Sequence, residues 1–128
     1  MTKIKSRTAN ERSGVTAVEM ALTLPLVILL VFGAYELSRA NMMMHTTEAA
    51  CYEGARMAIV PGAVRAECEQ ACRQVLATAG IRNATVQIRP NNLATISDIV
   101  SVTITVDYGD NTIMAPFFMR DSSLVRTC

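Results

Sequence analysis

The stretch "SGVTAVEMALTLPLVILLVFGAYEL", residues 13–37, decides the fold of this 128-residue chain. Its apolar run covers residues 15–37 and is interrupted by only two acids, Glu19 and Glu36. This run exceeds the roughly 20 residues that an α-helix needs to cross the hydrocarbon core of a membrane. The stretch therefore predicts a transmembrane helix over residues 15–37, in which a bilayer would tolerate Pro25.

Glu19 is the unusual residue of this run. An ionisable side chain inside a bilayer is costly and by default marks a functional site that needs a partner. The alternative is a charge that reaches the headgroup layer and has no function. Glu36, at the outer edge of the run, is expected to form a local pair with Arg39, because residues three apart are neighbours on a helix surface.

The distribution of charge predicts the orientation of the chain. Residues 1–14 carry four basic side chains and one acid, a net charge of +3, whereas the whole chain carries +1. Because basic segments tend to stay on the cytoplasmic side, residues 1–14 are expected to form a cytoplasmic leader and the residues after the apolar run to be exported. The small overall charge gives no indication of nucleic-acid binding.

The helical pattern continues beyond the membrane segment. Residues 38–60 contain no proline and a single glycine, and Glu53 and Arg56 have the i,i+3 spacing of a helix surface. A helical stalk over residues 38–60 is therefore predicted, ended by Pro61 and Gly62.

Residues 61–128 are expected to form a small exported α+β domain. Apolar residues first recur at the helical period and Gly80 is the expected helix cap. Residues 85–89 and 100–108 then alternate between apolar and polar, which predicts two antiparallel strands. Residues 108–111, "YGDN", are an expected turn, and residues 124–128 are a candidate third strand. The apolar positions of the second helix are Val64, Cys68, Ala71, Cys72, Val75, Leu76 and Ala79.

The chain has four cysteines, Cys51, Cys68, Cys72 and Cys128. In an exported segment they indicate disulfides, and three connectivities are open. A Cys68–Cys72 bridge within one helix is the least favoured, and bridges from the second helix to Cys51 and to Cys128 are preferred. The spacing of Cys68 and Cys72 also suits half a metal site or a thiol enzyme, but no second ligand pair and no catalytic motif accompanies them.

Two segments of the chain carry a recognisable motif, "GVTAVEMALTLPLVILLVFGAYELSRA" (14–40) and "EAACYEGARMAIV" (48–60). The motif positions include Gly14, Glu19, Pro25, Phe32, Gly33, Glu36 and Arg39, and then Ala49, Ala50, Glu53, Gly54, Ala55 and Arg56. With these residues the chain resembles the TadE-like pseudopilins of the tight-adherence pilus system, and the order of its parts resembles type IV pilins more broadly.

The resemblance implies cleavage between Gly14 and Val15 by a prepilin peptidase, which makes Glu19 the fifth residue of the mature chain. In pilins this acid is thought to neutralise the N-terminal amine of a neighbouring subunit, and Pro25 belongs to the same assembly segment. Arg39, Glu53 and Arg56 are expected to hold the sheet or a neighbouring subunit.

The expected function is that of a non-enzymatic minor pilin or pseudopilin in pilus assembly and surface adhesion. Its expected place is the bacterial plasma membrane, as a single-pass protein with its N-terminus in the cytoplasm, or a surface pilus. The expected partners are the bilayer, the prepilin peptidase and other pilins of the system. No catalytic residue, cofactor, metal, nucleic acid or small-molecule substrate is expected.

Three alternatives remain open. The first is an uncleaved single-span protein whose exported, disulfide-bonded module binds a partner. The second is a secretory signal cleaved before Asn41. The third is a membrane-tethered thiol enzyme that uses Cys68 and Cys72. Whether a pilin-like subunit would sit in the shaft, at the tip or in an assembly-priming complex is also left open by the sequence.

Overall fold

The computed structural model describes residues 7–90, 99–112, 116–117 and 119–128. The chain divides into two compact units, residues 1–35 and 36–128. Each unit is described by itself.

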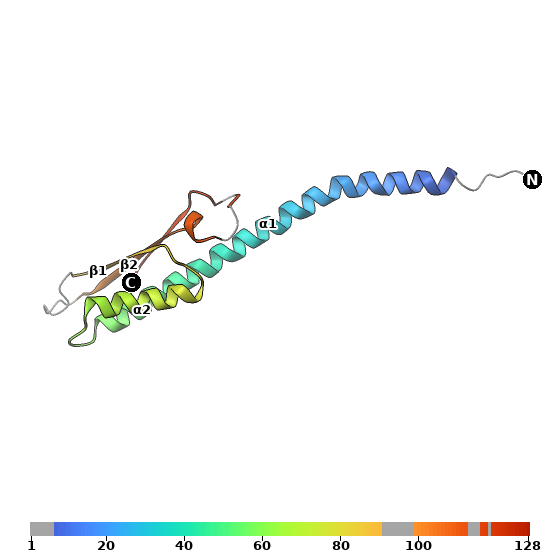
Figure 1. The fold of residues 1–128 in the computed structure, drawn as a ribbon. Helices are drawn as coiled ribbons and strands as arrows, with labels where there is room; N and C mark the ends of the chain where they lie inside the picture. The colour runs from blue at the N-terminus through green and yellow to red at the C-terminus, as the bar shows by residue number, and fades with distance from the viewer. Residues whose placement is uncertain (1–6, 91–98, 113–115, 118) are drawn as a thin grey trace, which may run out of the picture. The chain divides into compact units, whose positions relative to one another are not determined.

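Helix α1 (Arg7–Ala58) is the first element and runs from blue to green in Figure 1. The predicted continuity of the apolar segment and the stalk is confirmed, with Pro25 inside the helix. The helix begins at Arg7, so the part of the leader from Arg7 onward is helical as well. Within residues 14–35 every side chain is exposed, apart from half-buried Gly33.

Helix α2 (Arg65–Thr78) lies within the second unit. Its buried side chains are Cys68, Cys72 and Leu76, which confirms the centre of the predicted apolar stripe. The stripe does not begin at Val64, because this residue precedes the helix and is 52% exposed. Gly80 follows the helix at a φ of +69°, and its N–H bonds back to the carbonyl of Ala77. A left-handed residue at this position is the common way to end a helix and favours glycine, as the sequence predicts.

Three antiparallel strands form one sheet in the order β1, β2, β3. They are β1 (Ala84–Arg89), β2 (Ser101–Asp107) and β3 (Ser123–Thr127). Alternate residues of β2 are buried, because successive side chains of a strand point to opposite faces. A short 3₁₀ turn, η1 (Gly109–Asn111), follows β2 where the sequence predicts a turn. The α+β fold class is thus confirmed.

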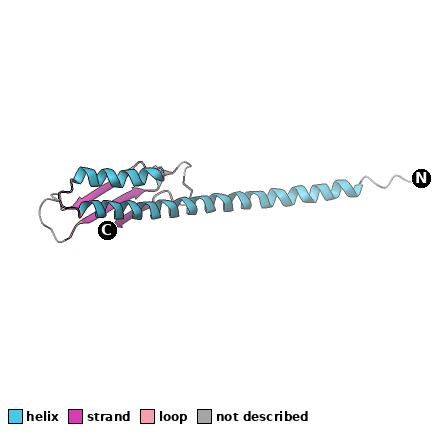
Figure 2. Cartoon of the chain, turned by 90° about the horizontal axis from the view of Figure 1, so that it is seen from below, coloured by secondary structure: helices cyan, strands magenta, loops and turns pink. Residues whose placement is uncertain are grey.

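The core of the second unit lies between one face of the sheet and two helices. Figures 1 and 2 show α2 beside the last turns of α1, with the strands running along both helices. Val102, Ile104 and Val106 of β2 are fully buried, as are Met43 and Cys51 of α1. The buried apolar residues of this core are Met43, Ala50, Cys51, Ala58, Cys68, Cys72, Leu76, Ala79, Ile81, Val86, Ile88, Val102, Ile104, Val106 and Tyr108.

Gly54 allows α1 and α2 to approach closely. A Cβ atom at this position would lie 2.3 Å from the sulfur of Cys72 and 3.5 Å from Cγ1 of Val102. The first distance is too short for any real contact, so the Cys72 sulfur occupies the space that a larger residue at position 54 would need. Both residues thus help to seat α2 on α1.

Candidate functional site

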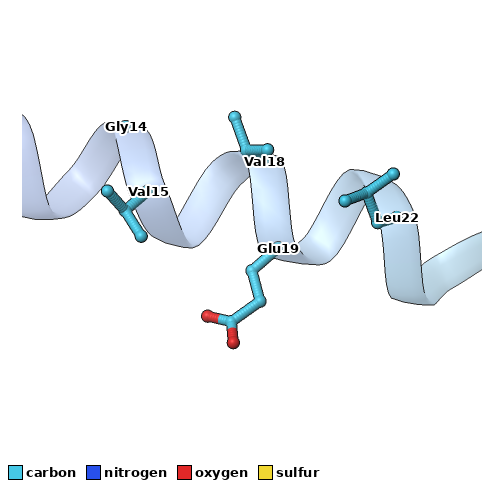
Figure 3. Close-up of a pocket in the computed structure, with 5 residues that line it drawn as sticks. All are labelled: Gly14, Val15, Val18, Glu19 and Leu22. Atoms are coloured by element: carbon cyan, nitrogen blue, oxygen red, sulfur yellow. The ribbon is translucent and has the colours of Figure 1, made fainter.

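Glu19 lies on the exposed surface of α1, in a shallow open groove. The other residues of this groove are Gly14, Val15, Val18 and Leu22. Figure 3 shows the Glu19 carboxylate projecting from the helix, with Val15 one turn earlier on the same side. Among the described residues, none forms an ion pair or a hydrogen bond with this carboxylate. Its surroundings are therefore apolar side chains that the described part of the chain leaves uncovered.

The backbone around Glu19 is satisfied locally. The Thr23 hydroxyl donates a hydrogen bond of 2.9 Å to the carbonyl of Glu19, one turn earlier in the helix. This contact places the threonine oxygen against the helix backbone, a common arrangement for a hydroxyl within an apolar helix. Pro25 follows two residues later, within the same helix.

Glu36 begins the part of α1 that belongs to the second unit, and it is buried with only 7% of its surface exposed. Its backbone carbonyl accepts a hydrogen bond of 3.1 Å from the Tyr108 hydroxyl. Its carboxylate Oε1 accepts one from the backbone N–H of Phe117. A buried carboxylate is stabilised by such donors, and Glu36 therefore connects α1 with the segment that follows β2.

Arg39, one turn further along, binds two backbone carbonyls. Its Nη1 donates to the Ala79 oxygen at 2.8 Å, and its Nη2 donates to the Asn111 oxygen at 2.9 Å. Ala79 caps the C-terminal end of α2, where helix carbonyls lack partners and a cation is favourable. Arg39 therefore joins three elements: α1, the end of α2 and η1.

Asn111 completes this junction. Its side-chain oxygen accepts hydrogen bonds from the N–H groups of Arg82 and Asn83, at 2.8 and 3.0 Å. Its side-chain nitrogen donates to the carbonyls of Asn83 and Asp107, at 2.8 and 2.9 Å. Four backbone groups are thus held by one buried amide, which fixes the carbonyl that Arg39 binds.

The sequence prediction of a local Glu36 and Arg39 pair missed these long-range contacts. The sequence does not indicate Tyr108 and Asn111 as partners, although Tyr108 is the last residue of the alternation over residues 100–108 and Asn111 is the last residue of the predicted turn. Both contacts join residues that are 72 positions apart in the sequence. The spacing of residues within one element predicts only contacts between neighbours in that element, so it could not predict these.

Glu53 and Arg56 form the predicted i,i+3 pair, with 3.5 Å between the Arg56 Nη1 and the Glu53 Oε2. The pair faces solvent, and exposed pairs of this kind contribute little to stability. Its place on the outer side of α1 leaves both side chains accessible to another molecule.

The four cysteines carry free thiols in this structure. Cys51, Cys68 and Cys72 are buried and Cys128 is exposed. Burial raises the pKa of Cys68, and it raises the pKa of Cys72 to about 11. A catalytic thiol needs a lowered pKa, so these raised pKa values disfavour a thiol enzyme that uses Cys68 and Cys72.

No group of three or more His, Cys, Asp or Glu side chains within the described residues is arranged to hold a metal ion. One helix in the described part of the chain, α1, is long and apolar enough to cross a membrane. The strongest candidate for a functional surface is therefore the exposed half of α1, residues 14–35, which contains Glu19.

The comparison with protein families matches residues 14–56 to the TadE-like protein family. This segment is about a third of the chain and includes Gly14, Glu19, Pro25 and the Glu36 to Arg56 part of α1. The comparisons with curated proteins and with solved structures find no match. The predicted resemblance is therefore confirmed over residues 14–56, where this chain is similar to the TadE-like protein family.

Proposed function

We propose that this chain is the precursor of a pilin-like structural subunit that is cleaved after Gly14 and assembles through the exposed half of α1. The observation that carries the proposal is the Glu19 carboxylate on an otherwise apolar, uncovered helix surface. Glu19 then acts as the acid that receives a neighbouring subunit, and the unit formed by residues 36–128 is the exported part.

The spacing of Val15 and Glu19 suits this role. Cleavage after Gly14 creates an amine on Val15, which lies four residues, about 6 Å along the helix axis, from Glu19. A second processed helix shifted by about the same distance brings its amine level with this carboxylate. An isolated carboxylate and an isolated ammonium are each costly in lipid, and pairing offsets that cost. Glu19 thereby sets the axial register between subunits.

The remaining site residues have supporting roles in this proposal. Pro25 removes one backbone donor within the membrane segment and allows the helix to bend against its neighbours. Glu36 and Arg39 hold the exported unit on α1, and Glu53 with Arg56 offers an exposed charged pair to a neighbouring subunit. The partners are thus a prepilin peptidase, other pilins of the same system and the bilayer, with no enzymatic activity of the chain itself.

The experiment replaces Glu19→Gln in the native host and measures both the amount of the protein in membranes and its amount in the sheared surface fraction. Membrane levels are expected to stay normal, because glutamine is inserted at least as readily as glutamate. Surface assembly is expected to fall at least tenfold. Glu48→Gln is the matched control, since Glu48 is an exposed acid of the same helix outside the apolar run.

Equal assembly of the Glu19→Gln variant and the wild type would remove the role of Glu19. A loss of assembly in the Glu48→Gln control as well would show that any loss of charge on α1 is sufficient, which also contradicts the proposal. An intermediate result for Glu19→Asp, which keeps the charge but shortens the side chain, would support a requirement for contact with a second charged group.

A further inference from the structure

Cys51 of α1 points at the sheet. It is fully buried, and its sulfur lies 3.2 Å from the carbonyl oxygen of Val102 in the central strand β2. The same sulfur lies 3.9 Å from the carbonyl oxygen of Arg126 in β3. Cys51 is thus placed over the boundary between β2 and β3.

Cys128 is paired directly with Val102. The two residues exchange both backbone hydrogen bonds, of 2.9 and 3.0 Å. Residues that face each other in this way point their side chains to the same side of a sheet. The Val102 side chain is fully buried beneath the helices, so the Cys128 side chain starts from the face that α1 covers.

The Val102 carbonyl therefore accepts a hydrogen bond from both cysteines. The Cys51 sulfur and the Cys128 N–H approach the same oxygen, at 3.2 and 3.0 Å. These two donor atoms are then no more than about 6 Å apart, a separation compatible with the geometry of bridged cysteines. Burial, and after it hydrogen bonding to Cys128 and the negative charges of Cys128 and Cys72, together raise the pKa of Cys51 to about 12, as expected of neighbouring thiols.

We propose that Cys51 and Cys128 form a disulfide that fastens the end of β3 to α1, while Cys68 and Cys72 remain buried thiols of the core. The proposal rests on the proposed function in one respect, the export of residues 36–128 to an oxidising compartment. It differs from the pairing that the sequence favours, in which the second helix supplies one cysteine to each bridge.

The positions of the other two cysteines support this assignment. The Cys72 sulfur fills the space above Gly54, where it packs between α2 and α1. Cys68 lies one turn earlier on the same helix and is buried as well. A bridge between these two would close a very short loop, whereas a bridge between Cys51 and Cys128 spans more than half of the chain and constrains the unfolded state more strongly.

The oxidant is a disulfide-bearing compound or protein. The exposed Cys128 thiolate attacks one of its sulfurs, which forms a mixed disulfide and releases the other sulfur as a thiolate. The sulfur of Cys51 then attacks Cys128 and displaces the second oxidant sulfur. In total, the thiols of Cys51 and Cys128 are oxidised to one disulfide, and the disulfide of the oxidant is reduced to two thiols. The two protons that leave the cysteines go to the oxidant sulfurs or to water.

The first test uses the full chain, purified in detergent, reduced, and then exposed to oxidised glutathione. Free thiols are blocked by alkylation, and the bridged peptides are identified by mass spectrometry after proteolysis. The wild type is expected to lose two of its four thiols and to yield one linked pair, Cys51 with Cys128. The double variant Cys68→Ser and Cys72→Ser is expected to yield the same pair, with circular dichroism confirming that it folds.

Two control variants complete this test. Cys51→Ser and Cys128→Ser are each expected to yield no internal bridge, and in Cys51→Ser the exposed Cys128 is expected to hold glutathione. A linked pair that contains Cys68 or Cys72, or four thiols that stay reduced in the folded wild type, would overturn the assignment while leaving the assembly role of Glu19 untouched.

The second test measures the thiols of the chain in membranes of its native host, by rapid acid quenching and alkylation. The Cys51–Cys128 bridge is expected in most molecules. A chain that forms the bridge in detergent but stays reduced in the host would overturn the proposal, because residues 36–128 would not have been exported to an oxidising compartment. The cysteine pairing would then be correct and the proposed topology would be wrong.

Discussion

The two halves of α1 differ in what covers them. In residues 14–35 the side chains are exposed and, apart from Glu19 and two threonines, mostly apolar, whereas in residues 36–58 a stripe of side chains is buried at helical spacing under the sheet and α2. The buried stripe includes Glu36, Met43 and Thr47. The more apolar half is therefore the half that the described residues leave uncovered.

This difference indicates which groups cover each half of α1. The second half uses its own chain, with Arg39 binding Ala79 and Asn111, and needs no further surface to be stable. The first half exposes a continuous apolar surface larger than soluble monomers usually present, which marks a surface that lipid or another protein covers. Predictions that compare variants in the two halves test this division directly.

The largest expected difference comes from truncating one apolar side chain in each region. Ile104→Ala is expected to lower the free energy of unfolding by about 2–5 kcal/mol, because Ile104 is fully buried and the change leaves a cavity. Leu29→Ala is expected to change it by less than about 0.5 kcal/mol, because Leu29 is 55% exposed.

Urea unfolding of the full chain in detergent, followed by circular dichroism, measures both values. Equal losses in the two variants would show that the side chains of residues 14–35 contribute as much to the stability of the fold as the core does, and would break the comparison.

The next largest effect is expected at Arg39. Arg39→Met keeps most of the side-chain volume but leaves the carbonyls of Ala79 and Asn111 without their donors, at a cost of about 2–3 kcal/mol in the free energy of unfolding. Arg39→Lys is expected to recover only part of this, since one ammonium does not reproduce the two-pronged geometry.

Arg56→Met is the matched control, because Arg56 makes an exposed pair with Glu53 and its loss is expected to cost less than about 0.5 kcal/mol. The same urea titration applies to all three variants. A cost at Arg56 as large as that at Arg39 would show that the exposed pair, and not the buried junction, holds the unit together.

The smallest of these effects is expected at Gly54. Gly54→Ala is expected to cost about 1–3 kcal/mol, because the new Cβ would meet the Cys72 sulfur. Cys72→Ala removes that sulfur, so the double variant is expected to lose less than the sum of the two single variants. Strict additivity in the thermal unfolding of the four proteins would mean that α1 and α2 do not approach each other at this point.

Much of the fold was accessible from the sequence because its elements are set by local pattern. The apolar run of residues 15–37, the helical stripe around Cys68 and Cys72 and the alternation in residues 100–108 each specify one element. Gly80 was predicted as a helix cap because a left-handed residue at that position favours glycine.

The contacts between elements were not accessible in the same way. The binding of Arg39 to the end of α2, and the placing of Cys51 beside Cys128, depend on how the sheet lies on α1. No spacing within one element reports on that arrangement, so the sequence offered a local partner for Arg39 and left the cysteine pairing open. The role of Glu19 rests on a partner outside the chain and stays a prediction.

The most direct test of the central claim is the N-terminal sequence and intact mass of the protein extracted from the membranes of its native host. The proposed assembly through the uncovered half of α1 requires a free amine one turn before Glu19, and therefore predicts a mature chain that begins at Val15. A chain that begins at Met1 or at Asn41 would contradict the account, because the first keeps the leader on the helix and the second removes Glu19 altogether.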